Sequence, residues 1–228
     1  MKNVLVIMKF YMKTLNRSNL WVFGCSFTKG DGTLEQDSYR KQYKINEGDL
    51  SWPYLLANQL NLTLRNMGEG GISNDTILDN IILNWDNINE GDYVIIGKTW
   101  SHRFDFPKRN NSLELKSIVY RGGEKDVKKW FNDITEGIYT STQIECIKTF
   151  SVEFATQQAY SKRHDLRFNF IRENLVRYKK IKLCYIWDVE TLWNNFELIV
   201  DATNGEINDY HWSYKGHKDF LSHLNQFL

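Results

Sequence analysis

The sequence predicts an α/β fold, namely a three-layer α/β/α sandwich in which helices cover both faces of a mainly parallel sheet. Two observations predict it. Short segments of strand length, such as Leu20–Phe23 and Tyr93–Ile96, are almost wholly apolar, as parallel strands buried on both faces are. Between them lie segments with apolar residues at helical spacing, such as Ile77–Ile82, and strand–helix alternation is typical of a parallel sheet.

The composition is that of one globular domain over residues 1–228. Hydrophobic residues make up 42% of the chain and aromatic residues 14%, which excludes a disordered protein. The 29 basic and 28 acidic residues nearly cancel, and this balance argues against a dedicated nucleic-acid partner. Three scattered cysteines are too few for a disulfide framework or a zinc site, and they indicate reduced thiols and a cytoplasmic setting.

Residues 1–18 predict an N-terminal extension, an extra strand or helix outside the main fold. Lysines interrupt its apolar run and no small-residue cleavage site follows, so we expect neither a signal peptide nor a membrane span. No membrane partner and no metal are expected, because no two histidines have the spacing of metal ligands. The oligomeric state is left open.

The first half of the chain predicts strands separated by turns and helices. Strands are expected at residues 20–23, 62–68 and 92–97, and helices at residues 51–59 and 74–88. Ser51 before a Trp-Pro pair is typical of a helix start, and Ser73 or Asn74 is expected to cap the second helix. The polar stretch over residues 31–49 predicts a surface loop.

In the second half, residues 104–165 are expected to be a variable insertion, and the sequence leaves open whether it forms a lid over the site. Within and after it, a small hairpin is expected near residues 117–120, helices at 126–139, 144–155 and 166–178, and strands at 181–187 and 196–200. Apolar residues such as Leu166 and Phe170 mark the third of these helices. A last helix is expected to follow Ser213, its N-cap.

Candidate chemistry begins at Ser26, which follows the carboxyl end of the first strand, where ligand sites form in open α/β sheets. A serine there is a nucleophile if a base can take its proton, whereas the alternative is a simple helix cap. Asp209 and His211 lie in a predicted loop before the last helix, as an orienting carboxylate and a base would. The alternative is an ordinary surface pair. The glycine-rich turn at residues 68–75 would offer N–H groups to an oxyanion.

These segments resemble the sequence blocks of the SGNH (GDSL-like) hydrolases. The matching segments are GCSFTKG, NMGEGGISN, IIGKTW and DYHWSYKGH, within residues 19–103 and 181–228, and SWPYLLANQL is most similar to phage and bacterial members. The resemblance implies a flavodoxin-like sheet and a catalytic triad of Ser26, Asp209 and His211. It further implies an oxyanion hole from Ser26, Gly71 and Thr99, no cofactor, and a gene of bacterial or viral origin.

Three departures from the family pattern bear on activity. Cys25 stands where the family has Asp, Thr99 stands where it has the oxyanion-hole Asn, and the acid and base are spaced Asp-x-His instead of Asp-x-x-His. A threonine hydroxyl has a shorter reach than a carboxamide, and losing one oxyanion donor lowers turnover by roughly 100- to 1000-fold. These changes concern efficiency more than fold.

The expected function is that of a serine esterase that hydrolyses a small-molecule or carbohydrate ester through a covalent acyl-serine, with deacetylation of a carbohydrate as its specific form. Two alternatives remain: a binding or structural module that has lost activity, and an O-acyltransferase. Substrate contacts are expected from Asn74, Trp100, Arg103 and Trp212, because aromatic rings can stack on sugar faces. The alternative for the tryptophans is packing in the core or a lid.

Overall fold

The centre of the molecule is a four-stranded sheet in which all neighbouring strands are parallel. The computed structural model describes residues 17–30, 50–101, 103–107, 115–119, 140–153, 157–200 and 207–228. The strand order is β2-β1-β3-β6. The strands are β1 (Asn19–Gly24), β2 (Thr63–Gly68), β3 (Tyr93–Lys98) and β6 (Leu183–Asp188). This order is that of the first four strands of a flavodoxin-like sheet, which confirms the predicted fold class.

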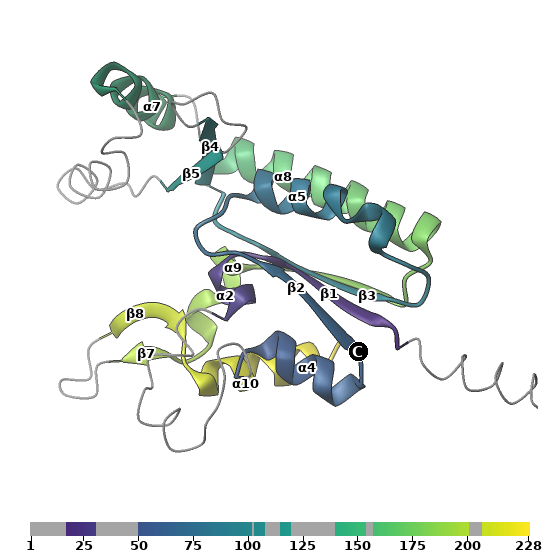
Figure 1. Ribbon diagram of the computed structural model, residues 1–228. Coiled ribbons are helices and arrows are strands. Elements are labelled where there is room, and N and C mark those ends of the chain that lie inside the picture. The colour runs from purple at the N-terminus through teal and green to yellow at the C-terminus, as the bar shows by residue number, and fades with distance from the viewer. Residues whose placement is uncertain are drawn as a thin grey trace, which may run out of the picture.

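Helices cover both faces of this sheet, as Figure 1 shows. On one face lie α5 (Asn74–Leu83) and α8 (Gln157–Asn174), and on the other lie α4 (Trp52–Leu60) and α10 (Tyr214–Leu224). Because β1 is covered on both sides, its apolar residues from Leu20 to Phe23 are all buried. The predicted three-layer sandwich is therefore confirmed.

Asp92 fixes the end of the sheet at which β1 begins. Its buried carboxylate accepts hydrogen bonds from the backbone N–H of Asn19 at 2.8 Å and from the indole N–H of Trp21 at 2.9 Å. The backbone carbonyl of Asp92 accepts from the N–H of Lys182, at 2.8 Å. The loop before β3 is thus bonded to the starts of both β1 and β6.

Two small antiparallel sheets stand beside the main one. In the first, β4 (Arg103–Pro107) pairs with β5 (Leu115–Val119), near the predicted hairpin, and in the second, β7 (Leu198–Val200) pairs irregularly with β8 (Ile207–Trp212). Asp209 and His211 therefore lie on a strand and not in the predicted loop. Backbone pairing with β7 explains the difference, because it extends a segment whose Asn and Asp residues favour a turn in isolation.

The remaining helices are short or stand apart from the central layers. They are α2 (Ser26–Lys29), α7 (Ser141–Glu153), α9 (Val189–Leu192) and the single turns Trp85–Asn87, Leu175–Lys179 and Trp193–Asn195. The predicted loop at 31–49, the predicted helix at 126–139 and residues 1–16 of the extension lie outside the described residues. In the described ranges, no helix combines the length and the apolar character needed to cross a membrane.

The helix starts follow the predicted caps with one exception. Ser73 accepts a hydrogen bond from the N–H of Thr76, and Ser213 accepts one from the N–H of Gly216, each at 3.1 Å. Ser51 precedes α4 as predicted, but its side chain makes no capping bond. Instead, the N–H of Trp52 donates to Nδ1 of His217 at 3.3 Å, so a buried imidazole from α10 caps α4.

Candidate active site

Ser26 lies where the sequence predicts it, immediately after β1 and at the first position of α2. The chain turns sharply here: a Cβ on Gly24 would stand 2.1 Å from Oγ1 of Thr28, so only glycine allows this close approach. Ser26 is 5% exposed. In the described part of the chain, its hydroxyl makes no hydrogen bond, so it is not committed to a helix cap.

The glycine-rich turn begins beside this serine. Gly24 of β1 pairs with Gly68 of β2, and the N–H of Glu69 donates to the carbonyl of Gly24 at 3.0 Å. Gly71 then adopts the left-handed conformation with φ +78°, which favours glycine, and no heavy atom of the residues that the structure describes would lie within 4 Å of a Cβ there. The predicted oxyanion loop is thus open and is held to the strand that carries Ser26.

His211 reaches the same place from the other end of the chain. β8 contacts α2, and the imidazole of His211 packs against the ring of Phe27, the residue after Ser26, with centroids 5.3 Å apart. No hydrogen bond joins Ser26 to His211 in the described residues. The backbone of Asp209 belongs to β8, whereas its side chain lies outside the described part of the structure.

Asn74 and Thr99 are joined by two hydrogen bonds. The N–H of Thr99 donates to Oδ1 of Asn74 at 2.8 Å, and Nδ2 of Asn74 donates to the carbonyl of Thr99 at 2.9 Å. Both residues are buried, at 2% and 1% exposure. Asn74 was predicted to contact substrate, but its amide is already occupied by the backbone, so it fixes the loop after β3 against the start of α5.

The hydroxyl of Thr99 is buried and has no hydrogen-bond partner in the described residues. An unpaired buried hydroxyl is costly, by about 1–3 kcal/mol, and such groups call for an explanation. Its neighbours along the chain belong to the site: Trp100 packs on Phe27 with ring centroids 5.7 Å apart. The position predicted for an oxyanion donor therefore carries a donor that no described protein group uses.

Trp100 and Arg103 form a stacked pair beside the site. The guanidinium of Arg103 lies 4.7 Å from the centre of the Trp100 ring, and its Nη1 donates to the carbonyl of Ile72 at 3.3 Å. Arg103 is 9% exposed, so most of its side chain serves to brace the glycine-rich turn. Trp100 is half-buried and keeps part of its surface available to a ligand.

Trp212 does not lie where the sequence prediction placed it. It is fully buried, its indole N–H donates to the carbonyl of Trp193 at 2.8 Å, and its ring contacts those of Phe27 and Phe220 with centroids 5.0 and 4.8 Å apart. Substrate contact by Trp212 is therefore corrected to a packing role. The reason is that β8 turns this side chain inward, against α10.

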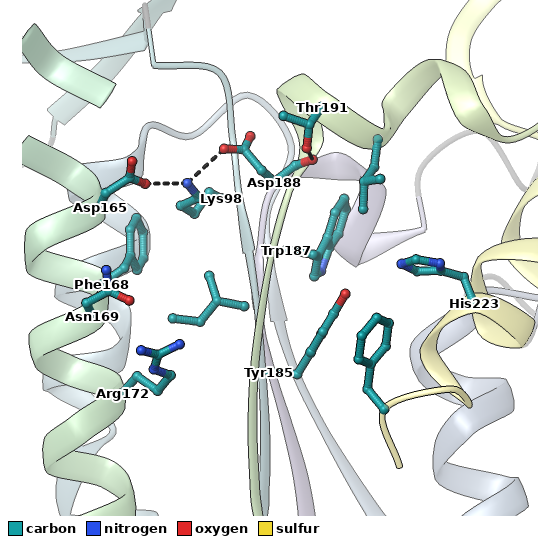
Figure 2. Close-up of a pocket in the computed structure, with 13 residues that line it drawn as sticks. Lys98, Asp165, Phe168, Asn169, Arg172, Tyr185, Trp187, Asp188, Thr191 and His223 are labelled. Atoms are coloured by element: carbon teal, nitrogen blue, oxygen red, sulfur yellow. Dashed lines mark hydrogen bonds and ion pairs between the residues drawn. The ribbon is translucent and has the colours of Figure 1, made fainter. Parts of the chain in front are cut away.

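Charged residues secure the carboxyl end of β3. The ammonium of Lys98 lies 2.5 Å from Asp165 of α8 and 2.8 Å from Asp188 of β6, as Figure 2 shows. Burial alone would lower the pKa of Lys98, but its hydrogen bonds to the two carboxylates raise that pKa above its ordinary value. A cavity of about 430 Å³ opens here at the edge of β6, and none of the predicted site residues lines it.

Two residues near the site were not predicted. Glu190 of α9 accepts hydrogen bonds from the N–H and hydroxyl of Ser101, at 3.4 and 3.1 Å, and so joins the loop after β3 to α9. Phe27 contacts both His211 and Trp100. Glu190 lies in a short polar stretch, and no local sequence pattern marks it as part of a site. Phe27 is adjacent in sequence to Ser26, and that position could have indicated its place at the site. In the ranges described, no three potential metal ligands come together.

No protein-family model and no curated protein sequence matches this chain. Among solved structures, a lipolytic protein of the G-D-S-L family from Desulfitobacterium hafniense DCB-2 is similar, with 14% identity over 92% of this chain and 99% of that chain and a TM-score of 0.39. Phospholipase A1 from Streptomyces albidoflavus NA297 is similar with 12% identity, the same coverage and a TM-score of 0.40. AlinE4, an SGNH-hydrolase family esterase, is similar with 14% identity over 93% and 95% of the two chains and a TM-score of 0.30. At these values the likeness carries no weight for the chemistry, which has to be judged from this chain's own residues.

Proposed function

We propose that the protein is a serine ester hydrolase that acts through a covalent acyl-serine. One observation carries the proposal: the turn that holds Ser26 and the strand that holds His211 come from opposite ends of the sequence and meet through Phe27. A serine nucleophile requires a base that can reach its hydroxyl, and this contact brings a half-buried imidazole to the turn that holds Ser26. The open glycine turn beside Ser26 supports the same chemistry.

In the proposed reaction, Oγ of Ser26 attacks the ester carbonyl while its proton passes to His211. The N–H groups of Ser26 and Gly71, with the hydroxyl of Thr99, would stabilise the negative oxygen that forms. His211 then gives its proton to the leaving alcohol. Water then loses a proton to His211 and attacks the acyl-serine; the bond between Oγ and the acyl group breaks, His211 returns the proton to Oγ of Ser26, and the acid departs. Asp209 stands two positions before His211 on β8 and would orient the imidazole, as a triad carboxylate does.

The substrate proposed is an acetylated carbohydrate. Support comes from Trp100, whose half-buried ring lies between Phe27 and Trp193 next to the Ser26 turn. Aromatic rings supply apolar area on which a sugar face can pack. Acetate release from a peracetylated monosaccharide, compared with hydrolysis of p-nitrophenyl esters of longer acids, tests this preference. A faster reaction with the longer esters would contradict it.

A fluorophosphonate probe tests the nucleophile directly. Oγ of Ser26 would form a bond to phosphorus, fluoride would leave, and the serine proton would pass to His211. We expect one adduct per chain at Ser26, none in Ser26→Ala, and labelling at least ~100-fold slower in His211→Ala. Ser222→Ala is the matched control, because that hydroxyl lies on the surface of α10 and donates to the carbonyl of Lys218. Equal labelling of Ser26→Ala and the parent would contradict the mechanism.

A second candidate function is a binding module without catalysis, favoured by the absence of a hydrogen bond between Ser26 and His211 in the described residues. The two candidates differ in the probe experiment, since a module would remain unlabelled although folded. An O-acyltransferase would use the same residues and would be labelled. Product analysis with a sugar acceptor separates that case from hydrolysis, because a transferase yields the acylated sugar instead of free acid.

A further inference from the structure

The central sheet has an open edge along β6. In a flavodoxin-like sheet a fifth strand lies beyond the fourth, but here β7 pairs with β8, and in the described residues no strand pairs with the outer side of β6. The cavity of about 430 Å³ lies along this edge, between α8 and α10, as Figure 2 shows. Because an edge strand presents unpaired N–H and C=O groups, this edge is a template for pairing with another strand.

Polar side chains from three elements line this cavity. They are Asn169 and Arg172 of α8, Tyr185 of β6 and His223 of α10. Within the ranges that the structure describes, none of the four makes a side-chain hydrogen bond or an ion pair. Phe227, which is 48% exposed, packs on Tyr185 with ring centroids 4.7 Å apart. The edge therefore offers both polar groups and apolar surface to a partner.

The charges that border the edge on α8 are self-complementary. Asp165 and Arg172 lie seven residues apart, about two turns of a helix, so both project towards the side of α8 that lines the cavity. Lys98 binds one oxygen of Asp165, yet the Asp165 side chain remains 47% exposed, and Arg172 is exposed as well. In an antiparallel pair of α8 helices, each Asp165 faces the Arg172 of the other copy. A two-fold axis thus produces two ion pairs.

The same two-fold axis fits β6. One ammonium, from β3, contacts both Asp165 and Asp188, so Asp165 lies at the level of the carboxyl end of β6. Arg172 lies further back along the strand: burial raises the pKa of the Cys184 thiol to about 12, and the nearby charge of Arg172 opposes that rise. The midpoint between Asp165 and Arg172 therefore lies near the middle of β6, around Ile186. One axis can relate both elements to their copies.

We propose that two copies of the chain pair along β6, antiparallel and about a two-fold axis, so that their four-stranded sheets form one continuous sheet. Backbone hydrogen bonds between the two β6 strands would join the sheets. Ion pairs between Asp165 of one copy and Arg172 of the other would border the contact on the α8 face. None of the predicted site residues lines this cavity, so the pairing is independent of the proposed hydrolysis.

Sedimentation equilibrium of the full chain measures this pairing. We expect a dimer of twice the 27.1 kDa chain mass at micromolar concentrations. Association should be at least about tenfold weaker in Arg172→Glu, which places like charges opposite each other at both ends of the contact. Arg163→Glu is the matched control. Arg163 is also exposed on α8, but it lies about two and a half turns before Arg172 and so faces another side, and its variant should associate as the parent does.

Amide hydrogen exchange of β6 separates strand pairing from a contact through helices alone. In a paired strand all amides of residues 183–187 are protected, whereas in an open edge those that point away from β3 exchange quickly. We therefore expect alternate amides of β6 to exchange about tenfold or more faster in Arg172→Glu than in the parent at the same concentration. The amides of β1, which is paired on both sides, should be protected equally in the two proteins.

Three results would overturn the proposal. A parent chain that stays monomeric at all concentrations would show that the edge does not bind a second copy. A dimer that Arg172→Glu does not weaken would place the contact elsewhere on the surface. A dimer in which alternate amides of β6 still exchange quickly would show that the strands themselves do not pair.

Discussion

At the scale of one residue, replacing Thr99 is expected to change stability and catalysis in different ways. Its buried hydroxyl has no partner in the described residues, so Thr99→Val should unfold at the same or a higher temperature than the parent. If that hydroxyl donates to the oxyanion, kcat for p-nitrophenyl acetate should fall about 100-fold or more. Thr76→Val is the control, because its hydroxyl donates to Asp105 at 2.7 Å, and losing that bond should lower stability without lowering kcat. Unchanged kcat in Thr99→Val would remove Thr99 from the oxyanion hole.

Asn74 acts on the proposed chemistry through the backbone of Thr99. Asn74→Ala removes both hydrogen bonds and should lower kcat by roughly 10- to 100-fold, because small displacements of positioned groups are that costly. KM should change little, since the side chain is 2% exposed. Asn74→Asp keeps an oxygen that can accept from the N–H of Thr99, so its kcat should lie between that of the parent and that of Asn74→Ala. A raised KM with unchanged kcat would instead indicate the substrate contact that the sequence suggested.

At the scale of elements, His217 joins α10 to α4 and makes that junction sensitive to pH. Burial, and to a lesser degree the nearby His211, lowers the pKa of His217 to about 3 from an ordinary 6.5. The unfolded chain therefore binds a proton that the folded chain does not, so stability falls as the pH is lowered from about 6.5 towards 3. The contribution is fully present above about pH 6.5.

Urea unfolding at pH 7.5 and pH 5 measures this effect. The parent should lose stability between the two, whereas His217→Gln, which does not titrate, should lose less. Asp75 does not affect the comparison. The imidazole of His164, with its Nε2 3.6 Å from Oδ1 of Asp75, outweighs burial and, together with Arg167, lowers the pKa of Asp75 to about 2, so the contribution of Asp75 to stability is lost only below about pH 4. Equal losses in parent and variant would contradict the assignment.

Local sequence patterns located most elements of the fold because they report local physics. The apolar runs of β1 and β3 and the serine caps at Ser73 and Ser213 depend on near neighbours, and all are found as predicted. β8 was not predicted, since its pairing partner β7 is needed to extend it. The exposure of Phe170 was not predictable either, because α8 turns its neighbours Phe168 and Ile171 towards the sheet instead.

At the scale of the whole molecule, the sequence predicted which segments meet but not how each side chain is used. Parallel strands bring their carboxyl ends to one edge, so Ser26 and the glycine turn were expected to lie together. His211 reaches the same place on β8, which belongs to a separate antiparallel pair. Whether Trp212 faces ligand or core depends on α10, and whether Asn74 is free depends on Thr99. Such contacts between distant segments leave no local pattern.

The contact between the turn after the first strand and the last strand has a practical consequence for expression and handling. A product truncated by a premature stop codon or by a protease before residue 207 keeps all four strands of the central sheet and both helices on one face. It has the proposed nucleophile but lacks the imidazole. Turnover in a crude extract would therefore show that the chain includes the final strand. Gel mobility would show this less clearly, because a slightly shortened chain migrates almost like the full one.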